Sequence, residues 1–474
     1  MPAGPRPWTV ARLTPPPRPR RSWWAALGVA ALAGVLRLVN LGHPAGLIFD
    51  EVYYAQDAKT LWEHGVEWNV QNDSAAYVAH PPFGKWLIGL GEQALGYDEV
   101  GWRIASVLAG TLCVLVLVRL ILRLTGSVSL SAVGGVLLAV EGSNFVLSRS
   151  ALLDIFLTLF VLLAFHFLVA DRQNRDLAAL GEGGRVPYRL LSAVSLGLAM
   201  GVKWSALWFI VLALLLVYFW DAQRNRVLKK RRPWVRPLGS AVLYGLYTVG
   251  VYLVTWAGWF ASGDAYYRRS WAAEGHSDIP VLADLGSWFL YHLNVLNFHE
   301  GLSTPHTYQS TPFEWLFNLR PVVFYWSNDV ECGVEKCAAE VILLGTPLLW
   351  WAFVPALLVM GLWGIAKKDW RAALVWGAVA AGIVPWLFFP ERTMFFFYAA
   401  PVVPFFIIAV VWCLGLAIGR RDASPERRLV GSLIAGAYVA AVILCFAYFW
   451  PIYTGEPIPY EEWQARLWLG NRWV

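Results

Sequence analysis

Long apolar runs separated by short polar loops recur along most of this chain. Runs of about 20 residues fit the roughly 30 Å hydrocarbon core of a bilayer when they form helices. The pattern therefore predicts an all-α integral membrane protein with about eleven transmembrane helices. These are expected near residues 23–41, 104–122, 128–147, 151–170, 190–203, 205–220, 237–260, 341–365, 371–389, 395–418 and 429–450.

The two segments between residues 190 and 220 are short for two full crossings. Their 31 residues would extend only about 46 Å as helix. Both flanks are basic, so they are expected on the same side of the membrane. We interpret the pair as a hairpin with its tip at residues 201–205.

The composition excludes several classes of protein. Hydrophobic residues make up 58% of the 474 residues and charged residues only 15%, whereas a soluble protein carries about 25% charged residues. A soluble enzyme, a disordered protein and a single-span receptor are therefore excluded. Residues 1–22 are rich in Pro and Arg, and we predict a disordered arm there instead of a cleaved signal peptide.

The loop charges predict the orientation in the membrane. Alternate loops, together with the arm, hold 25 basic and 7 acidic residues, and the opposite side holds 12 basic and 25 acidic residues. Basic loops face the cytoplasm. We expect a multi-pass protein of the cell membrane with its N-terminus in the cytoplasm and its C-terminus outside. Because the net charge of +6 comes from these short loops, no nucleic-acid partner is expected.

Two outer segments are long enough to hold chemistry, so catalysis is expected on the outer face. The predicted division of the chain is an arm at 1–22, a transmembrane catalytic module at 23–260 with the first outer segment at 42–103, the second outer segment at 261–340, and a four-span module at 341–474. Short amphipathic helices on the membrane surface are expected in the outer segments.

Asp50 and Glu51 open the first outer segment, directly after the first span. Acidic residues there are often only helix caps. The segment that follows is amphipathic, so Asp50 is expected at the depth of the lipid headgroups. A general base at that depth could meet a lipid-borne substrate. Downstream, His80 and Lys85 flank a stiff Pro-Pro turn at a similar depth.

Four basic residues lie at the outer ends of spans, where cations are disfavoured: Arg103, Arg149, Lys203 and Arg392. One such cation could reach a lipid phosphate by snorkelling. Four of them suggest a bound anion, for which a phosphate is the natural candidate. Arg37 lies inside the first span at a cost of about 2.5–3.5 kcal/mol, and we expect it to pair with an acid such as Glu51 or Asp154.

Cysteines and histidines give two further expectations. Cys332 and Cys337 lie in the second outer segment, where an oxidising environment favours a disulfide over two free thiols. No metal site is expected, because no His pair completes a Cys ligand set at suitable spacing.

In this order the motifs form a pattern that resembles the protein O-mannosyltransferases of the GT-C class of membrane glycosyltransferases. The resemblance covers nearly the whole chain after residue 23. It rests on Arg37, residues 49–53, residues 80–85, Arg103, residues 148–154, residues 201–205, the stretch through Tyr308 and Ser310, and the four C-terminal spans.

Such a resemblance implies transfer of mannose from polyprenyl-phosphate mannose to Ser or Thr hydroxyls of exported proteins, with inversion and without a metal or other cofactor. By motif, Asp50 is the base with Glu51 beside it. Arg103 and Lys203 hold the donor phosphate, with Arg149 as a third candidate, and Arg37 supports Glu51. Supporting roles are also expected for His80, Lys85 and Arg392.

One departure and three alternatives accompany this hypothesis. Eukaryotic members carry a β-trefoil domain where this chain has only residues 261–340, so the chain looks like the bacterial type, and contact with the protein export machinery is an open expectation. The alternatives are a GT-C enzyme that moves another sugar, such as aminoarabinose, to a lipid acceptor, a transporter of a polyprenyl-linked sugar, and a structural membrane scaffold.

Overall fold

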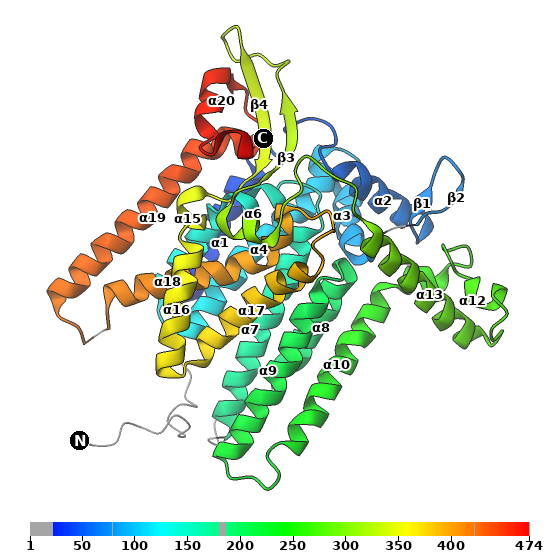
Figure 1. Ribbon diagram of the computed structural model, residues 1–474, viewed down its shortest axis with the longest axis horizontal. Coiled ribbons are helices and arrows are strands. Elements are labelled where there is room, and N and C mark those ends of the chain that lie inside the picture. The colour runs from blue at the N-terminus through cyan, green and yellow to red at the C-terminus, as the bar shows by residue number, and fades with distance from the viewer. Residues whose placement is uncertain (1–21, 78, 180–185, 421, 474) are drawn as a thin grey trace.

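The computed structural model describes residues 22–77, 79–179, 186–420 and 422–473, which form a mostly helical molecule (Figure 1). The predicted arm lies outside the described residues, apart from Ser22. The N-terminal half contains α1 (Ser22–Leu38), α2 (Glu51–His64), β1 (Trp68–Asn69), β2 (Ser74–Ala75), α3 (Phe83–Leu95), α4 (Glu99–Thr125), α5 (Val128–Ala139), α6 (Gly142–Leu147), α7 (Asp154–Ala179), α8 (Tyr188–Val202), α9 (Ala206–Val227) and α10 (Val235–Thr255).

The rest of the chain adds the second outer segment and the C-terminal spans. The segment begins with α11 (Ala257–Ala261), α12 (Ser270–Ala273), α13 (Pro280–Gly301) and α14 (Pro312–Phe317), followed by β3 (Val322–Ser327) and β4 (Cys337–Leu343). The C-terminal part contains α15 (Pro347–Trp350), α16 (Phe353–Lys367), α17 (Trp370–Ile383), η2 (Val384–Phe388), η3 (Phe396–Val402), α18 (Val403–Ile418), α19 (Pro425–Thr454), β5 (Ile458–Pro459), α20 (Tyr460–Arg466) and η4 (Gly470–Arg472).

Each of the eleven predicted spans contains an apolar helix. Among the described residues, eight helical segments are long and apolar enough to cross a membrane, and α1, α5 and α8 are shorter apolar helices. The windows of α4, α7 and α18 are mostly buried inside the protein, whereas α10 and α19 are mostly uncovered and lie at its edges (Figure 1). One predicted span, 128–147, is divided into α5 and α6 because Glu141 caps α6 by accepting hydrogen bonds from two of its first N–H groups.

The predicted hairpin is present as α8 and α9. Lys203 lies beside Asp154 at one end of the pair, and Arg189 contacts both Asp171 and Asp221 at the other end, so the two helices run in opposite directions. The helices also continue past residues 190 and 220, to Tyr188 and Val227. The sequence predicted two helices that were too short, because the polar ends of α8 and α9 lie outside the apolar runs from which the spans were predicted.

Close helix packing brings α4 against the first span. A Cβ atom on Gly110 would lie 1.9 Å from Ser148 Oγ and 3.0 Å from Arg37 Nε. Only glycine therefore allows this approach. The N-terminus of α4 is fixed by Asp98, whose side chain accepts a hydrogen bond from the Gly101 N–H. Because these contacts fix the N-terminus of α4 and its packing against α1, they also fix the position of Arg103, which lies near the start of α4.

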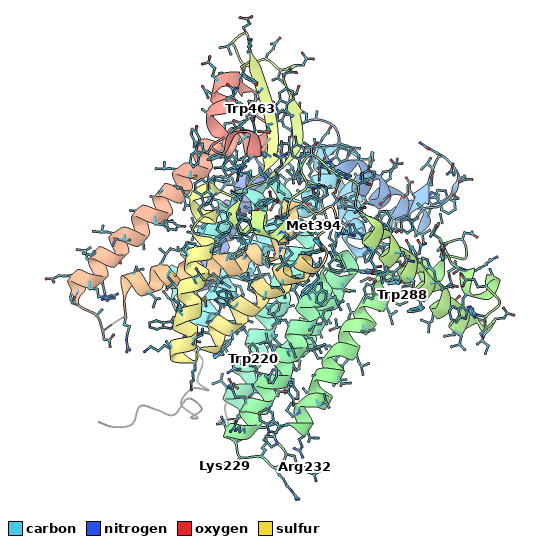
Figure 2. The ribbon with its side chains drawn as sticks, in the orientation of Figure 1. Trp220, Lys229, Arg232, Trp288, Met394 and Trp463 are labelled. Carbon is cyan, nitrogen blue, oxygen red and sulfur yellow. A yellow bond between two sulfur atoms is a disulfide. The ribbon has the colours of Figure 1, made fainter. Side chains whose placement is uncertain are left out.

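A small antiparallel sheet rises above the helices in the order β3-β4-β5. The pairing of β3 with β4 runs from Val322 opposite Leu343, with an irregularity after Val323. Figure 2 shows Trp463 of α20 beside this sheet, where its indole N–H donates to Glu340. A disulfide joins Cys332 to Cys337 at the hairpin end of β4, which confirms the predicted pairing.

Candidate functional site

The adjacent carboxylates at the start of α2 have opposite surroundings. Glu51 is fully buried and accepts hydrogen bonds from Arg103 Nε and Nη2, both at 2.9 Å, and from the backbone N–H groups of Ile48 and Ala151. Asp50 occupies the N-cap position without a capping hydrogen bond, and no described residue donates to its carboxylate. Asp50 is therefore the carboxylate that is free to accept a proton.

Burial raises the pKa of Asp50 to about 6; Lys203 opposes this rise and Asp154 adds to it. A base works best when its pKa lies near the operating pH. The Asp50 carboxylate combines availability with a pKa only slightly below neutrality. The carboxylate also lies close enough to Lys203 and Asp154 to interact electrostatically with both.

Lys203 lies in the break between α8 and α9, and Asp154 is the first residue of α7. The Lys203 Nζ atom is 2.7 Å from Asp154 Oδ2. It is also 5.3 Å from the ring centre of Phe397 and 5.9 Å from that of Tyr398, within range of cation–π attraction. The break thus holds a cation in a fixed place at the end of two spans.

A cavity of about 190 Å³ opens beside this ion pair. Its walls come from α7, the α8–α9 break, α13 and the segment around Arg392. The residues are His80, Asp154, Leu157, Lys203, Trp204, Ser205, Leu207, Trp208, Leu296, His299, Glu300, Trp386, Phe389, Arg392 and Tyr398. Two of the four predicted phosphate-binding cations therefore face one cavity that is partly aromatic and partly charged.

His80 and His299 stack on the cavity wall with ring centres 5.5 Å apart. Burial and the charge of Lys203 lower the pKa of His80. Burial and the charge of Arg392 lower the pKa of His299 to about 4. Arg392 donates to the His299 carbonyl and to Nδ1. Both imidazoles are therefore neutral at pH 7 and add no repulsion toward a cationic neighbour.

Arg103 is not among the residues that line the cavity, and its predicted contact with the donor phosphate stays a prediction. Its side chain is fully buried. Besides Glu51, it donates to the carbonyls of Leu41, Pro44 and Gly46. The guanidinium is thus occupied by the loop that leads from α1 to Asp50, and its role there is to position that loop.

Arg149 has a similar internal role. It donates to the carbonyls of Arg37, Val39 and Asn40 at the end of α1. A cation at a helix C-terminus satisfies carbonyls that lack partners within the helix. Arg149 therefore holds the end of α1, and its predicted contact with a donor phosphate stays a prediction.

Arg37 departs from its expected pairing with an acid, and Lys85 pairs with acids outside the cavity lining. Arg37 donates to the side-chain oxygen of Asn144 at 2.9 Å and to two backbone carbonyls, so its expected pairing with Glu51 or Asp154 is wrong. Neutral acceptors thus take the hydrogen bonds of both Nη atoms, while Nε has no hydrogen-bond partner among the described residues. Lys85 is 2.5 Å from Glu67 and 3.5 Å from Asp57 and does not line the cavity.

Sequence reasoning missed part of the site. The sequence pattern indicates Asp154 only as a candidate partner for Arg37 and as the last residue of the 148–154 motif, yet it holds Lys203. His299 and Trp204 were not selected, although both line the cavity. The available signal for Asp154 was an acid at the very start of an apolar span. His299 lacked any comparable pattern, since no ligand spacing marks it.

The chain matches two family descriptions. Residues 28–262 match "Dolichyl-phosphate-mannose-protein mannosyltransferase", and residues 285–473 match "C-terminal four TMM region of protein-O-mannosyltransferase". The polyprenol-phosphate-mannose–protein mannosyltransferase of Mycobacterium tuberculosis is 37% identical, over 96% of this chain and 92% of that relative.

Solved structures share the fold. A chain of the Saccharomyces cerevisiae protein O-mannosyltransferase Pmt1-Pmt2 complex bound to the sugar donor has a TM-score of 0.77 and 15% identity, over 98% of this chain and 94% of that one. ArnT from Cupriavidus metallidurans bound to undecaprenyl phosphate has a TM-score of 0.53 and 19% identity, over 91% of this chain and 71% of that one. These likenesses confirm the predicted GT-C fold. By its sequence relatives, the chain belongs to the family of polyprenol-phosphate-mannose-dependent protein O-mannosyltransferases.

Proposed function

We propose that the chain transfers mannose from polyprenyl-phosphate mannose to Ser or Thr hydroxyls of exported proteins, on the outer face of the membrane and with inversion. The observation that carries this proposal is the contrast between Asp50 and Glu51. One carboxylate is fully engaged by Arg103 and backbone N–H groups, and its neighbour is free and has a raised pKa.

The proposed reaction is a single displacement. Asp50 accepts the proton of the acceptor hydroxyl, whose oxygen forms a bond to the anomeric carbon of mannose. The bond from that carbon to the phosphate oxygen breaks, and the polyprenyl phosphate leaves with the electron pair. A leaving phosphate needs positive charge, and the cations that line the cavity are Lys203 and Arg392.

Arg103 and Arg149 support this step at a distance. Between them they hold six carbonyls of the loop and helix end that precede Asp50. Glu51 is fixed by the same guanidinium of Arg103. We therefore infer that these groups set the position of Asp50 instead of touching the donor.

The proposed topology places the N-terminus in the cytoplasm and the C-terminus outside the cell membrane. It is supported by the segregation of loop charges and by the position of the site, which is built at the ends of α7, α8 and α9 next to both outer segments. Acceptors would then arrive from outside, where contact with the export machinery is a further proposal.

The test uses membranes that contain the protein, radiolabelled polyprenyl-phosphate mannose and a Ser/Thr-rich peptide. Wild type should label the peptide. Asp50→Asn keeps the shape but removes the proton acceptor, so turnover at saturating donor should fall about 10²–10⁴-fold. Near-normal transfer by an equal amount of folded variant would remove Asp50 from the mechanism. Label in a lipid but not in the peptide would instead support a lipid acceptor.

A further inference from the structure

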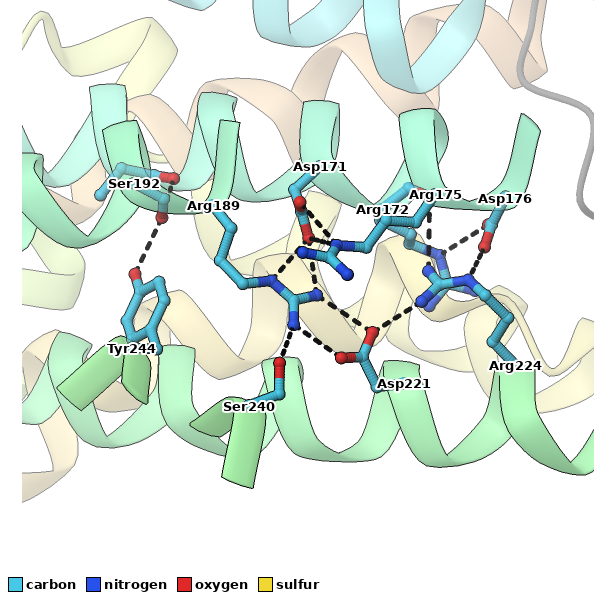
Figure 3. Close-up of polar contacts among 11 residues, drawn as sticks. Asp171, Arg172, Arg175, Asp176, Arg189, Ser192, Asp221, Arg224, Ser240 and Tyr244 are labelled. Atoms are coloured by element: carbon cyan, nitrogen blue, oxygen red, sulfur yellow. Dashed lines mark hydrogen bonds and ion pairs between the residues drawn. The ribbon is translucent and has the colours of Figure 1, made fainter. Parts of the chain in front are cut away.

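Charged side chains from α7, α8 and α9 meet polar side chains of α10 (Figure 3), at the end of these helices away from the candidate site. Arg189 of α8 donates hydrogen bonds to Asp171 of α7, Asp221 of α9 and Ser240 of α10. Arg224 of α9 also donates to Asp221, at 2.6 Å. These contacts link α7, α8, α9 and α10 to one another, so the backbone that carries the neighbouring side chains is held in place.

A cavity of about 420 Å³ lies at this end of the bundle. We call it the basic cavity, because its charged lining residues are the cations Arg175, Arg224, Lys230 and Arg236 and the single acid Asp221. The Asp221 carboxylate is already neutralised by two guanidinium groups. The lining therefore carries surplus positive charge.

Two of these cations have no ion-pair partner among the described residues. Arg175 donates to Asp171, and Arg224 donates to Asp176 and Asp221. Lys230 and Arg236 are exposed, and within the described part of the chain no ion pair involves either of them. Their N–H donors are available for an anion, and phosphate suits a cavity rimmed by Arg and Lys.

The surroundings favour a phosphate that belongs to a lipid. Val235 and Leu238 flank Arg236 on α10 and are 62% and 59% exposed. Trp234, at the start of the same helix, is 46% exposed, and exposed Trp is typical of the headgroup level of a membrane. Figure 2 shows Lys229 and Arg232 at the tip of the adjoining loop. Basic pockets between membrane helices bind anionic headgroups.

We propose that the basic cavity binds the phosphate of an anionic phospholipid headgroup, with Lys230 and Arg236 as the contacting cations. The acyl chains would lie along the exposed apolar face of α10. This site is separate from the mannose-transfer site: Asp154 begins α7, whereas Arg175, which lines the basic cavity, lies in its last two turns, about 32 Å further along the helix.

The experiment titrates the full-length protein in detergent with phosphatidylglycerol or phosphatidylcholine and counts bound lipid by native mass spectrometry. The test variant is Lys230→Gln/Arg236→Gln. The matched control, Arg427→Gln/Arg428→Gln, removes two exposed cations from another loop end. Thermal melting and mannose transfer confirm that both variants fold.

Wild type and the control should prefer phosphatidylglycerol, and the test variant should bind it roughly 30-fold more weakly, since each basic residue contributes about 1 kcal/mol and 1.4 kcal/mol is tenfold. A competition experiment, in which inorganic phosphate or glycerol 3-phosphate is added to the phosphatidylglycerol complex, distinguishes a lipid phosphate from a soluble phosphate as the bound anion. Equal phosphatidylglycerol affinity of the two variants would overturn the proposal. Tight binding of the soluble phosphates without a lipid preference would also overturn it.

Discussion

At the scale of single residues, two carboxylates of the same chemistry differ in their hydrogen bonds and therefore in what they can do. Asp50 and Glu51 are neighbours with the same functional group. Glu51 is surrounded by donors, which stabilise its charge but leave no lone pair for a substrate. Asp50 has lost much of its water without gaining such donors, so its pKa rises. The sequence places both acids at the boundary, but only the fold separates a base from a structural ion pair.

The raised pKa of Asp50 predicts a pH dependence. A base must be deprotonated, so mannose transfer should increase with pH through about 6 and level off above it. The measurement is the pH profile of kcat/KM for wild type, with protein stability checked at each pH. In Asp50→Asn the residual rate should lack this limb. A wild-type profile that is flat between pH 5 and 7 would contradict the assignment.

The Arg103–Glu51 pair predicts a loss of stability. Arg103→Ala would leave a buried carboxylate without its partner, at a cost of about 3–5 kcal/mol. Arg103→Lys should recover little, because the two parallel hydrogen bonds require a guanidinium. Thermal melting gives the measurement, and the control is Arg103→Ala/Glu51→Gln, which should be more stable than Arg103→Ala alone. A stable Arg103→Ala with raised donor KM would instead restore a donor contact.

At the scale of elements, the break between α8 and α9 explains how a cation is presented to the cavity. Lys203 is the last hydrogen-bonded residue of α8 and has extended backbone angles. Its side chain can therefore leave the helix end and reach Asp154 across the gap. Hydrophobic periodicity located both helices and the break, because apolar runs are long and the 201–205 tip interrupts them. It could not give the pairing partner, which lies 49 residues away.

Replacement of Lys203 is expected to lower the efficiency with which the donor is used. Lys203→Gln removes a positive charge from the cavity wall, so kcat/KM for the donor should fall about 10–150-fold, equivalent to about 1.5–3 kcal/mol. Lys85→Gln provides the control. It also removes a buried lysine charge, but one paired with Glu67 away from the cavity, so it should lower stability and leave donor KM unchanged in the folded protein. Equal donor kinetics for Lys203→Gln and wild type would exclude a donor role.

At the scale of the whole molecule, the sequence predicted those features of the structure that depend mainly on one physical effect. Burial of apolar helices in a bilayer is a large effect, and it predicted the eleven helical segments and the helical membrane class, whereas the GT-C fold was implied by the motif resemblance. The partners of an arginine depend on which acceptors the fold brings within hydrogen-bond distance, so the sequence pattern indicated a wrong partner for Arg37 and could not give the carbonyls that Arg103 and Arg149 hold. The β3–β4 pair was not predicted, because a lone hairpin gives only two short strand patterns.

The proposed topology gives the last prediction. Lys229 lies at the tip of the α9–α10 loop (Figure 2), and Val281, near the start of α13, is 67% exposed. Of the described free cysteines, Cys113 and Cys445 are buried and Cys413 is half-buried, so the labelling background carries Cys413→Ser, and the two buried thiols should react slowly with a charged thiol reagent. Single cysteines at Lys229 and Val281 should then be labelled only from the cytoplasm and only from outside, respectively, because basic loops stay inside. Labelling of both from one side of intact cells would overturn the eleven-span topology, since α10 (Val235–Thr255), which lies between the two positions, would then not cross the membrane.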